Sequence, residues 1–104
     1  MKKIINGLRY DTEKAIEVGT ASHGYAGDHQ QWEATLYKTP RSGRFFLAGS
    51  GGPASRFAQS AGQNSWSGGS DLIPMSIDEA LDWAEANLDP DDIEEHFGDT
   101  VEDA

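Results

Sequence analysis

The chain has no cysteine and no long hydrophobic run, and no lysine or arginine follows Arg56. The absence of cysteine excludes disulfides and thiolate chemistry and is typical of a protein from a reducing compartment. The N-terminal residues contain no apolar stretch long enough for a signal peptide, and no segment approaches the length of a membrane span. We therefore expect a cytoplasmic protein without membrane association.

The charged residues that are present are strongly segregated along the chain. Residues 71–104 contain 13 of the 18 acidic side chains, whereas residues 1–70 contain all eight basic side chains and only five acidic ones. A net charge of −10 disfavours free nucleic acid and anionic lipid as partners. It favours a positively charged protein groove, above all one that itself binds nucleic acid.

At 104 residues with ten aromatic residues, the chain has the size of a single domain, 1–104, with one modest core. Within this domain, the first half of the chain predicts two β-hairpins. Residues 2–10 form the first predicted hairpin, because Asn6-Gly7 tolerates the positive φ angles of a tight turn. Alternating apolar residues predict the second, with strands at 31–37 and 44–48.

Weaker patterns cover the segments between and after these hairpins. Asp11 or Thr12 is expected to cap a short helix that runs to about Val18, and residues 20–30 read as a loop. We further expect a helical turn at 54–60, turns at 61–70 and a short edge strand at 72–75, since Pro74 is unsuited to a central strand.

The final third of the chain predicts two acidic helices. Ser76 with Glu79 has the pattern of a capping box, and an apolar stripe runs along the first helix through Ile77, Ala80, Leu81, Ala84 and Leu88. Trp83 lies off this stripe, which leaves its role open between packing and contact with a partner.

The second helix is expected to start at Pro90 with Asp89 as its N-cap. Ile93 and Phe97 would anchor it and Gly98 would end it, with residues 99–104 frayed. The expected fold class is α+β, a small antiparallel sheet built from hairpins with helices packed on one face.

The acidic helices supply the candidate partner-binding residues. Those on the first helix and its end repeat at helical spacing and cover about 16 Å, so their charge density is close to the one phosphate per ~3.4 Å of a nucleic acid strand. The full candidate set is Asp78, Glu79, Asp82, Glu85, Asp89, Asp91, Asp92, Glu94 and Glu95.

Other interpretations of the acidic residues remain open. An exposed acidic face is often a device for solubility alone, although ordinary solvated helices mix lysine with glutamate. Residues 89–94 begin like a calcium loop but lack its required glycine, and His23 and His29 are the only candidates to converge with Asp28 on a metal. We expect no metal, no cofactor and no catalytic residue, because an exposed acidic cluster lacks the burial that separates two carboxyl pKa values.

The basic and aromatic residues do not form a nucleic-acid patch in the sequence. The basic residues Lys2, Lys3, Arg9, Arg41, Arg44 and Arg56 are few and scattered, and they are candidates to balance part of the acidic helix within the chain. Most aromatics are expected in the core, whereas Tyr25 and Trp66 lie in polar segments and are candidate anchors for a protein partner.

Several segments together resemble a widespread group of short acidic proteins encoded on bacterial mobile elements. Some members of that group are anti-CRISPR proteins, including inhibitors of type I systems, among them type I-C. The resemblance spans most of the chain but includes no active-site signature. The segments that carry it are residues 3–7, 9–12, 32–37, 43–47, 51–58, 73–76 and 79–85.

The resemblance implies an inhibitor that occupies the DNA-binding surface of the Cascade surveillance complex in the bacterial host. The charge pattern independently favours such a surface, because a surveillance complex holds DNA in a basic channel. We expect a monomer that acts as a DNA mimic on a Cas protein complex and does not bind nucleic acid directly. The alternative is an acidic inhibitor of another basic DNA-binding enzyme, such as a restriction enzyme or a nuclease.

Overall fold

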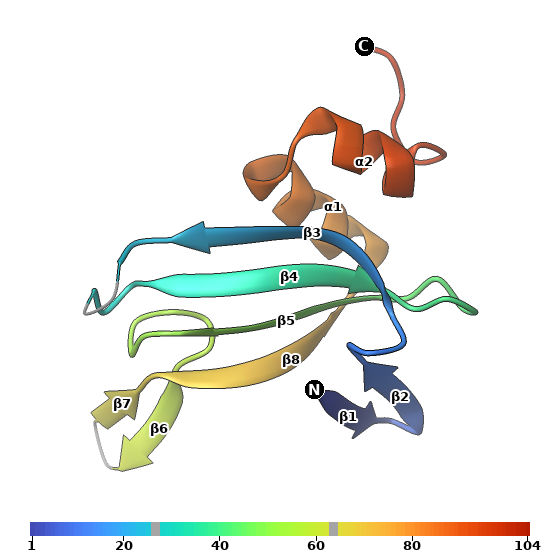
Figure 1. Ribbon diagram of the computed structural model, residues 1–104. Coiled ribbons are helices and arrows are strands. Elements are labelled where there is room, and N and C mark those ends of the chain that lie inside the picture. The colour runs from blue at the N-terminus through green and yellow to red at the C-terminus, as the bar shows by residue number, and fades with distance from the viewer. Residues whose placement is uncertain (26–27, 63–64) are drawn as a thin grey trace.

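A four-stranded antiparallel sheet forms the centre of the molecule (Figure 1). The computed structural model describes residues 1–25, 28–62 and 65–104, with side chains described outside residues 60–66. The strand order is β3-β4-β5-β8. These strands are β3 (Ile16–His23), β4 (Trp32–Lys38), β5 (Phe45–Gly51) and β8 (Gly69–Met75).

Two separate hairpins and two helices complete the described structure. Both helices lie over one face of the sheet, and the first hairpin lies toward the other face (Figure 1). The fold class is therefore α+β, as the sequence predicted. The remaining elements are β1 (Lys2–Ile5), β2 (Leu8–Asp11), β6 (Gln59–Gly62), β7 (Ser65–Ser67), α1 (Ile77–Asn87) and α2 (Pro90–Phe97).

Strand β5 separates two hydrophobic clusters, because its successive side chains point to opposite faces of the sheet. Phe45 and Leu47 join the larger cluster beneath the helices, and Phe46 and Ala48 join the smaller one on the other face. In the smaller cluster Tyr10 meets the Phe46 ring edge-on, with centroids 5.5 Å apart. This contact attaches the β1–β2 hairpin to the sheet.

Both predicted hairpins are confirmed. Asn6 and Gly7 have φ angles of 52° and 79°, the combination that a type I′ turn requires. Strands β4 and β5 pair in register from Trp32–Gly51 to Lys38–Phe45. The predicted edge strand is also present, since β8 is the last strand of the four-stranded sheet and pairs with β5 alone. Pro74 therefore lies on an edge strand, opposite Phe46 of β5.

The helix predicted from Asp11 or Thr12 to Val18 is wrong. Residues 12–15 form turns, and residues 16–23 form β3, which also takes the first part of the loop predicted at 20–30. Val18 is buried between exposed or half-buried neighbours, which is the period of a strand. Pairing with β4 along the length of β3 outweighs the local capping pattern, because strand propensity depends mainly on tertiary context.

The segment between β5 and β8 also differs from the prediction. Residues 53–57 form turns that bury Phe57 completely, and no helical turn is present there. Residues 59–62 and 65–67 pair as the strands β6 and β7. The side chain of Trp66 lies outside the described residues, so its predicted role as an anchor is not addressed by the structure.

Helix α1 begins as predicted, and four of the five residues of its predicted stripe pack in the main cluster, but Ile77 does not and Trp83 does. Ser76 and Glu79 form the complete capping box, yet Ile77 is 48% exposed and Trp83 only 7% exposed. The fully buried residues of the helix are Ala80, Trp83 and Ala84, and Leu81 and Leu88 are partly buried against the same cluster. Trp83 is therefore a packing residue in the main cluster.

Helix α2 follows its prediction closely. Asp89 is the N-cap, Pro90 the first helical residue and Gly98 the C-cap, although the Asp89 side chain makes no capping hydrogen bond. Phe97 is 2% exposed and its ring stacks on Phe45 with centroids 4.7 Å apart. Residues 101–104 are exposed and have no regular secondary structure.

Candidate functional site

The nine predicted carboxylates all lie on α1, on α2 or at the junction between them. We call this set the acidic face. Its members are exposed to solvent, except for the half-buried Asp92. They are Asp78, Glu79, Asp82 and Glu85 on α1, Asp89 at the junction, and Asp91, Asp92, Glu94 and Glu95 on α2.

The α1 part of the acidic face results directly from the helix's buried stripe. Since Ala80 and Ala84 point to the sheet, residues that are displaced around the helix by more than a quarter turn are directed to solvent. Asp78, Asp82 and Glu85 occupy such positions and are all exposed. Their i, i+4, i+7 spacing places them along one helical line.

Asp89 does not continue that line as a fourth helical residue. Leu88 has φ −115° and ψ 164°, which is extended backbone and ends α1. Asp89 therefore begins a new helix with its own direction, and the acidic face bends between residues 87 and 90. The prediction of one straight stripe holds for three carboxylates, and the remaining ones lie around this corner.

No lysine or arginine pairs directly with a carboxylate of the acidic face, although Arg56 lies near enough to Glu79 to act on it through its charge. Every charged side chain lies within the described residues, and the only ion pairs with an N···O distance of 4.0 Å or less are Lys3–Asp71 and the weak His96–Glu95 contact at 3.8 Å. The predicted balancing of the acidic helix by basic residues of the same chain is thus not observed as direct pairing.

Glu79 is the one carboxylate of the face with a structural role. Its Oε1 accepts the backbone N–H of Ser76 at 3.0 Å, and Ser76 Oγ accepts the N–H of Glu79 at 3.1 Å. The backbone N–H of Ser76, then its side chain, and more weakly the charge of Arg56 hold the pKa of Glu79 below its ordinary value of 4.5. Glu79 therefore remains ionised at neutral pH.

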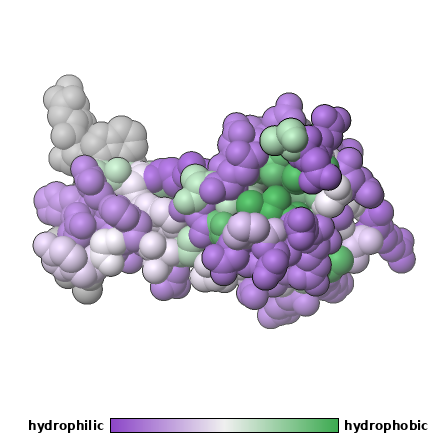
Figure 2. Space-filling view, turned by 90° about the horizontal axis from the view of Figure 1, so that it is seen from above, coloured by the Kyte–Doolittle hydropathy of each residue, from purple (hydrophilic) through white to green (hydrophobic). Residues whose placement is uncertain are grey.

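The helical side of the molecule also exposes apolar surface. Seen from above the helices, hydrophilic residues surround a smaller hydrophobic area (Figure 2). An apolar centre with a polar rim is the usual arrangement of a protein–protein interface. The acidic face is therefore part of a surface that presents exposed apolar area as well as charge.

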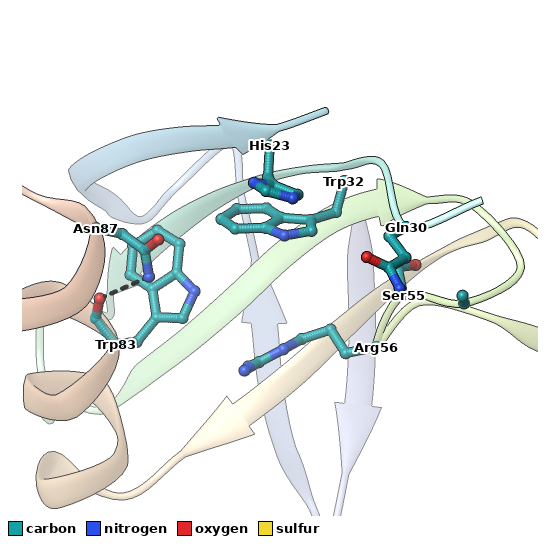
Figure 3. Close-up of a pocket in the computed structure, with 8 residues that line it drawn as sticks. His23, Gln30, Trp32, Ser55, Arg56, Trp83 and Asn87 are labelled. Carbon is teal, nitrogen blue, oxygen red and sulfur yellow. Dashed lines mark hydrogen bonds between the residues drawn. The ribbon is translucent and has the colours of Figure 1, made fainter. Parts of the chain in front are cut away.

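A pocket of about 340 Å³ adjoins α1 on the side of the sheet. We call it the aromatic pocket. It opens between the end of β3, the start of β4, the turn after β5 and the C-terminal half of α1 (Figure 3). Its lining residues are His23, Gln30, Trp32, Ala54, Ser55, Arg56, Trp83 and Asn87.

Two indole rings dominate the aromatic pocket. The centroids of Trp32 and Trp83 lie 6.3 Å apart with the planes tilted by 56°, and the His23 ring stacks over Trp32. Figure 3 shows Arg56 extending from the turn after β5 toward Trp83. Among the labelled residues the drawn hydrogen bond joins Asn87 Nδ2 to the Trp83 carbonyl oxygen at 2.9 Å. The pocket can accept a flat or apolar group beside the acidic face.

Sequence reasoning did not find the aromatic pocket, because its residues come from distant segments. Trp32 is one of the aromatics expected in the core, and it is half-buried. The predicted exposure of Tyr25 is confirmed at 74%. His23 does not converge with His29 and Asp28, and the described residues contain no group of three or more metal-ligating side chains.

Several of the basic residues that appear scattered in the sequence converge in space. Arg9, Lys14, Arg41 and Arg44 line one pocket of about 450 Å³, together with Asp11. We call it the basic pocket. Arg9, Arg41 and Arg44 are therefore not scattered as the sequence suggested, because the fold places the turn after β2 beside the turn between β4 and β5.

Comparison of the chain with protein-family models, with curated proteins and with solved structures found no match. Within the described residues, neither α1 nor α2 has the length and apolar character needed to cross a membrane.

Proposed function

We propose that the protein is an inhibitor whose acidic face docks onto the basic DNA-binding surface of a protein complex and blocks target DNA. The complex that the family resemblance implies is the Cascade surveillance complex of a type I system, in particular type I-C. The inhibitor acts by occupation and electrostatic competition, without covalent chemistry, and therefore needs no catalytic residue.

One observation carries this proposal. Nine carboxylates are presented on two consecutive helices, and none of them has a lysine or arginine within 4.0 Å. The capping box fixes the start of α1, the buried residues of α1 pack in the main cluster, and the stack of Phe97 on Phe45 attaches α2. A rigid row of fixed charges loses little entropy on binding, which favours affinity.

The charge of this face is suited to a surface that normally holds phosphates. Complementary fields accelerate association and direct the orientation of the complex. The aromatic pocket beside α1 provides a depression for an apolar anchor from the partner, and such anchors dominate the binding energy of many interfaces. The charge of the face therefore attracts the partner, and the pocket contributes shape complementarity.

The test is competition for DNA on purified type I-C Cascade with labelled target DNA. The wild-type protein is expected to displace DNA at saturation, and its inhibition should weaken steeply as salt rises, because the screening length falls to about 3 Å at 1 M ionic strength. Intact DNA binding in the presence of saturating protein would refute the proposed mechanism.

A matched pair of charge reversals locates the interface. Asp78→Lys/Asp82→Lys/Glu85→Lys is expected to abolish inhibition, since it reverses the charges along the exposed line of α1. The control is Glu13→Lys/Glu17→Lys/Glu33→Lys, which changes the net charge equally at three exposed acidic positions outside the helices. Equal loss in both variants would assign the effect to net charge rather than to the acidic face.

The same face fits the basic DNA cleft of a restriction enzyme or a nuclease. Capture of host proteins on immobilised wild-type protein, with the α1 triple variant as the reference, distinguishes these targets. Recovery of Cas subunits on the wild type alone supports Cascade. Recovery of a nuclease or restriction enzyme in their place would redirect the proposal to that enzyme.

A further inference from the structure

The basic pocket lies outside the acidic face and has the opposite charge. It gathers four of the chain's eight lysine and arginine side chains. Arg9 comes from β2, Lys14 from the turn that follows, and Arg41 and Arg44 from the turn between β4 and β5. With Asp11 as the only acidic lining residue, the pocket is locally positive within a chain of net charge −10.

None of these four cations forms an ion pair with a carboxylate of the described residues. No carboxylate oxygen of the chain lies within 4.0 Å of any of them, and all charged residues are among those described. The Oδ1 atom of Asp11 accepts the backbone N–H of Glu13 at 3.0 Å. Four unpaired like charges around one concavity repel one another, and an anion between them would remove that repulsion.

The backbone that carries the cations is held by hydrogen bonds. In the turn between β4 and β5, the N–H of Thr39 donates to the Arg44 carbonyl oxygen at 2.8 Å, and the N–H of Arg44 donates to Thr39 Oγ1 at 2.9 Å. Thr39 Oγ1 also pairs with Ser42 Oγ at 3.0 Å. In the other turn the N–H of Lys14 donates to the Asp11 carbonyl oxygen. Fixed turns lower the entropy cost of binding a ligand between them.

The composition of the pocket favours phosphate over carboxylate. Each guanidinium presents five donors in a planar fork that matches phosphate bidentately. A phosphate monoester offers three acceptor oxygens and a charge of about −1.5 to −2 at neutral pH, whereas a carboxylate offers two oxygens and a single charge. Three arginines and one lysine therefore suit a phosphate group best.

The rest of the lining limits the size of the ligand. Leu8, Ala15 and Pro40 add apolar surface to the pocket, and a volume of about 450 Å³ lies within the usual range for small-molecule sites. A long polyanion would extend beyond the pocket into the field of a protein with 18 acidic residues. We propose that the basic pocket binds the phosphate group of a compact phosphorylated molecule.

The test is an NMR-monitored titration of the isotope-labelled full chain with adenosine 5′-monophosphate at low salt. Saturable shifts are expected at residues 9–15 and 39–44, and adenosine without phosphate should bind at least about tenfold more weakly, because charge-assisted hydrogen bonds are lost. Equal binding of the two molecules, or no saturable binding of the phosphorylated one, would overturn the proposal.

Two substitutions control for non-specific attraction. Arg41→Gln/Arg44→Gln is expected to weaken binding by at least about tenfold, and both positions are exposed, so the fold should persist by circular dichroism. Lys2→Gln removes an exposed cation that does not line the basic pocket and should leave the affinity unchanged. Unchanged binding in the double variant, or an equal loss in Lys2→Gln, would also overturn the assignment.

Further probes separate the possible sources of the phosphate. Inorganic phosphate that competes with the nucleotide confirms that the phosphate is the group recognised. A 5′-phosphorylated oligonucleotide that binds more tightly than the mononucleotide would contradict the restriction to compact ligands. Concentration-dependent dimerisation that Arg41→Gln/Arg44→Gln abolishes, without nucleotide binding, would show that a second copy's acidic face occupies the pocket and would refute the proposal.

Discussion

The acidic face and the basic pocket are assembled in different ways. The acidic face comes from one continuous stretch, residues 78–95, whereas the basic pocket draws its cations from residues 9, 14, 41 and 44. The first needs only two helices with their apolar sides directed to the sheet. The second exists only when the β1–β2 hairpin and the β4–β5 turn are both in their folded positions.

The two regions also have a property in common. Neither the nine carboxylates nor the four cations form a lysine–carboxylate or arginine–carboxylate pair within 4.0 Å, although both signs are present on one small domain. Folding alone does not favour such separation, because like charges that lie close together repel. Each cluster is therefore available to an external partner: the carboxylates lie on two helices at the surface, and the cations line one pocket.

The largest expected effect comes from separating the acidic face from the sheet. Phe97→Ala removes the ring that stacks on Phe45 and is expected to lower the free energy of unfolding by about 3–5 kcal/mol. Urea denaturation measures this change. If α2 is released locally, the nucleotide titration of the basic pocket should remain unchanged in the variant while it is folded.

Val101→Ala is the matched control, because Val101 is 44% exposed and lies just beyond α2. Its effect should stay within about 0.5 kcal/mol. A loss in Phe97→Ala no larger than that of the control would mean that the helix is held by other contacts and that the acidic face does not depend on the stack.

The sequence predicted the two acidic helices well because the signals that mark their starts are local. Ser76 with Glu79 and Pro90 after Asp89 mark helix starts within a few residues, and those rules are satisfied regardless of the rest of the chain. The buried face of α1 was assigned less well. Whether Ile77 or Trp83 faces the core depends on how the helix is rotated against the sheet, and helical spacing alone allows both.

The basic pocket could not be predicted in the same way. Its turn residues and the Asn6-Gly7 hairpin were visible, but the convergence of Arg9 with Arg44 depends on the placement of two hairpins relative to each other. The missed strand β3 has the same origin, because its pairing with β4 is non-local, whereas the capping residue Asp11 is a local signal for a helix. Tertiary context decided both cases.

A smaller effect is expected from removing the cap of the acidic helix. Ser76→Ala deletes the side chain that accepts the N–H of Glu79 and should lower the free energy of unfolding by about 1 kcal/mol. Denaturant titration at neutral pH measures it. Ser76→Thr, which keeps the hydroxyl, should retain most of the stability, and an equal loss in both variants would contradict the capping role.

The same cap predicts a pH effect with a definite sign. Since the folded state lowers the pKa of Glu79 from its ordinary value of 4.5, the stabilisation is fully present above pH 4.5 and is lost as the pH falls through the folded pKa. NMR titration of the Glu79 carboxyl should show this lowered pKa. Removal of the Ser76 hydroxyl should move it part of the way back, and an unchanged value would disprove that contribution.

A still smaller effect is expected at the Lys3–Asp71 ion pair, the only lysine–carboxylate pair among the described residues, which joins the β1–β2 hairpin to β8. Lys3 Nζ lies 2.9 Å from Asp71 Oδ1, with both side chains nearly half exposed. Lys3→Met should cost about 0.2–1 kcal/mol, as expected for an exposed ion pair. The hydrogen bond that Lys3 donates to Asp71 is the main cause of the lowered pKa of Asp71. Lys3→Met should therefore raise that pKa toward 3.8 in an NMR titration.

Lys2→Met provides the control for this pair, because Lys2 is a neighbouring exposed lysine that forms no ion pair. It should leave both the unfolding free energy and the pKa of Asp71 nearly unchanged. An equal response to the two substitutions would show that the hairpin is attracted by general charge and not by the specific bridge.

The smallest expected effects have the opposite sign and test the comparison itself. Glu85→Lys relieves repulsion along α1, and Arg41→Gln relieves repulsion around the basic pocket, so each should raise the unfolding free energy by a few tenths of a kcal/mol at low salt. The gain should shrink at high salt, where exposed charges are screened. Because Glu85→Lys should also weaken partner binding and Arg41→Gln should weaken phosphate binding, stability and function would change in opposite directions at both sites. A loss of stability in both variants would instead mean that the charges support the fold, and the reason for regarding the two clusters as binding surfaces would be removed.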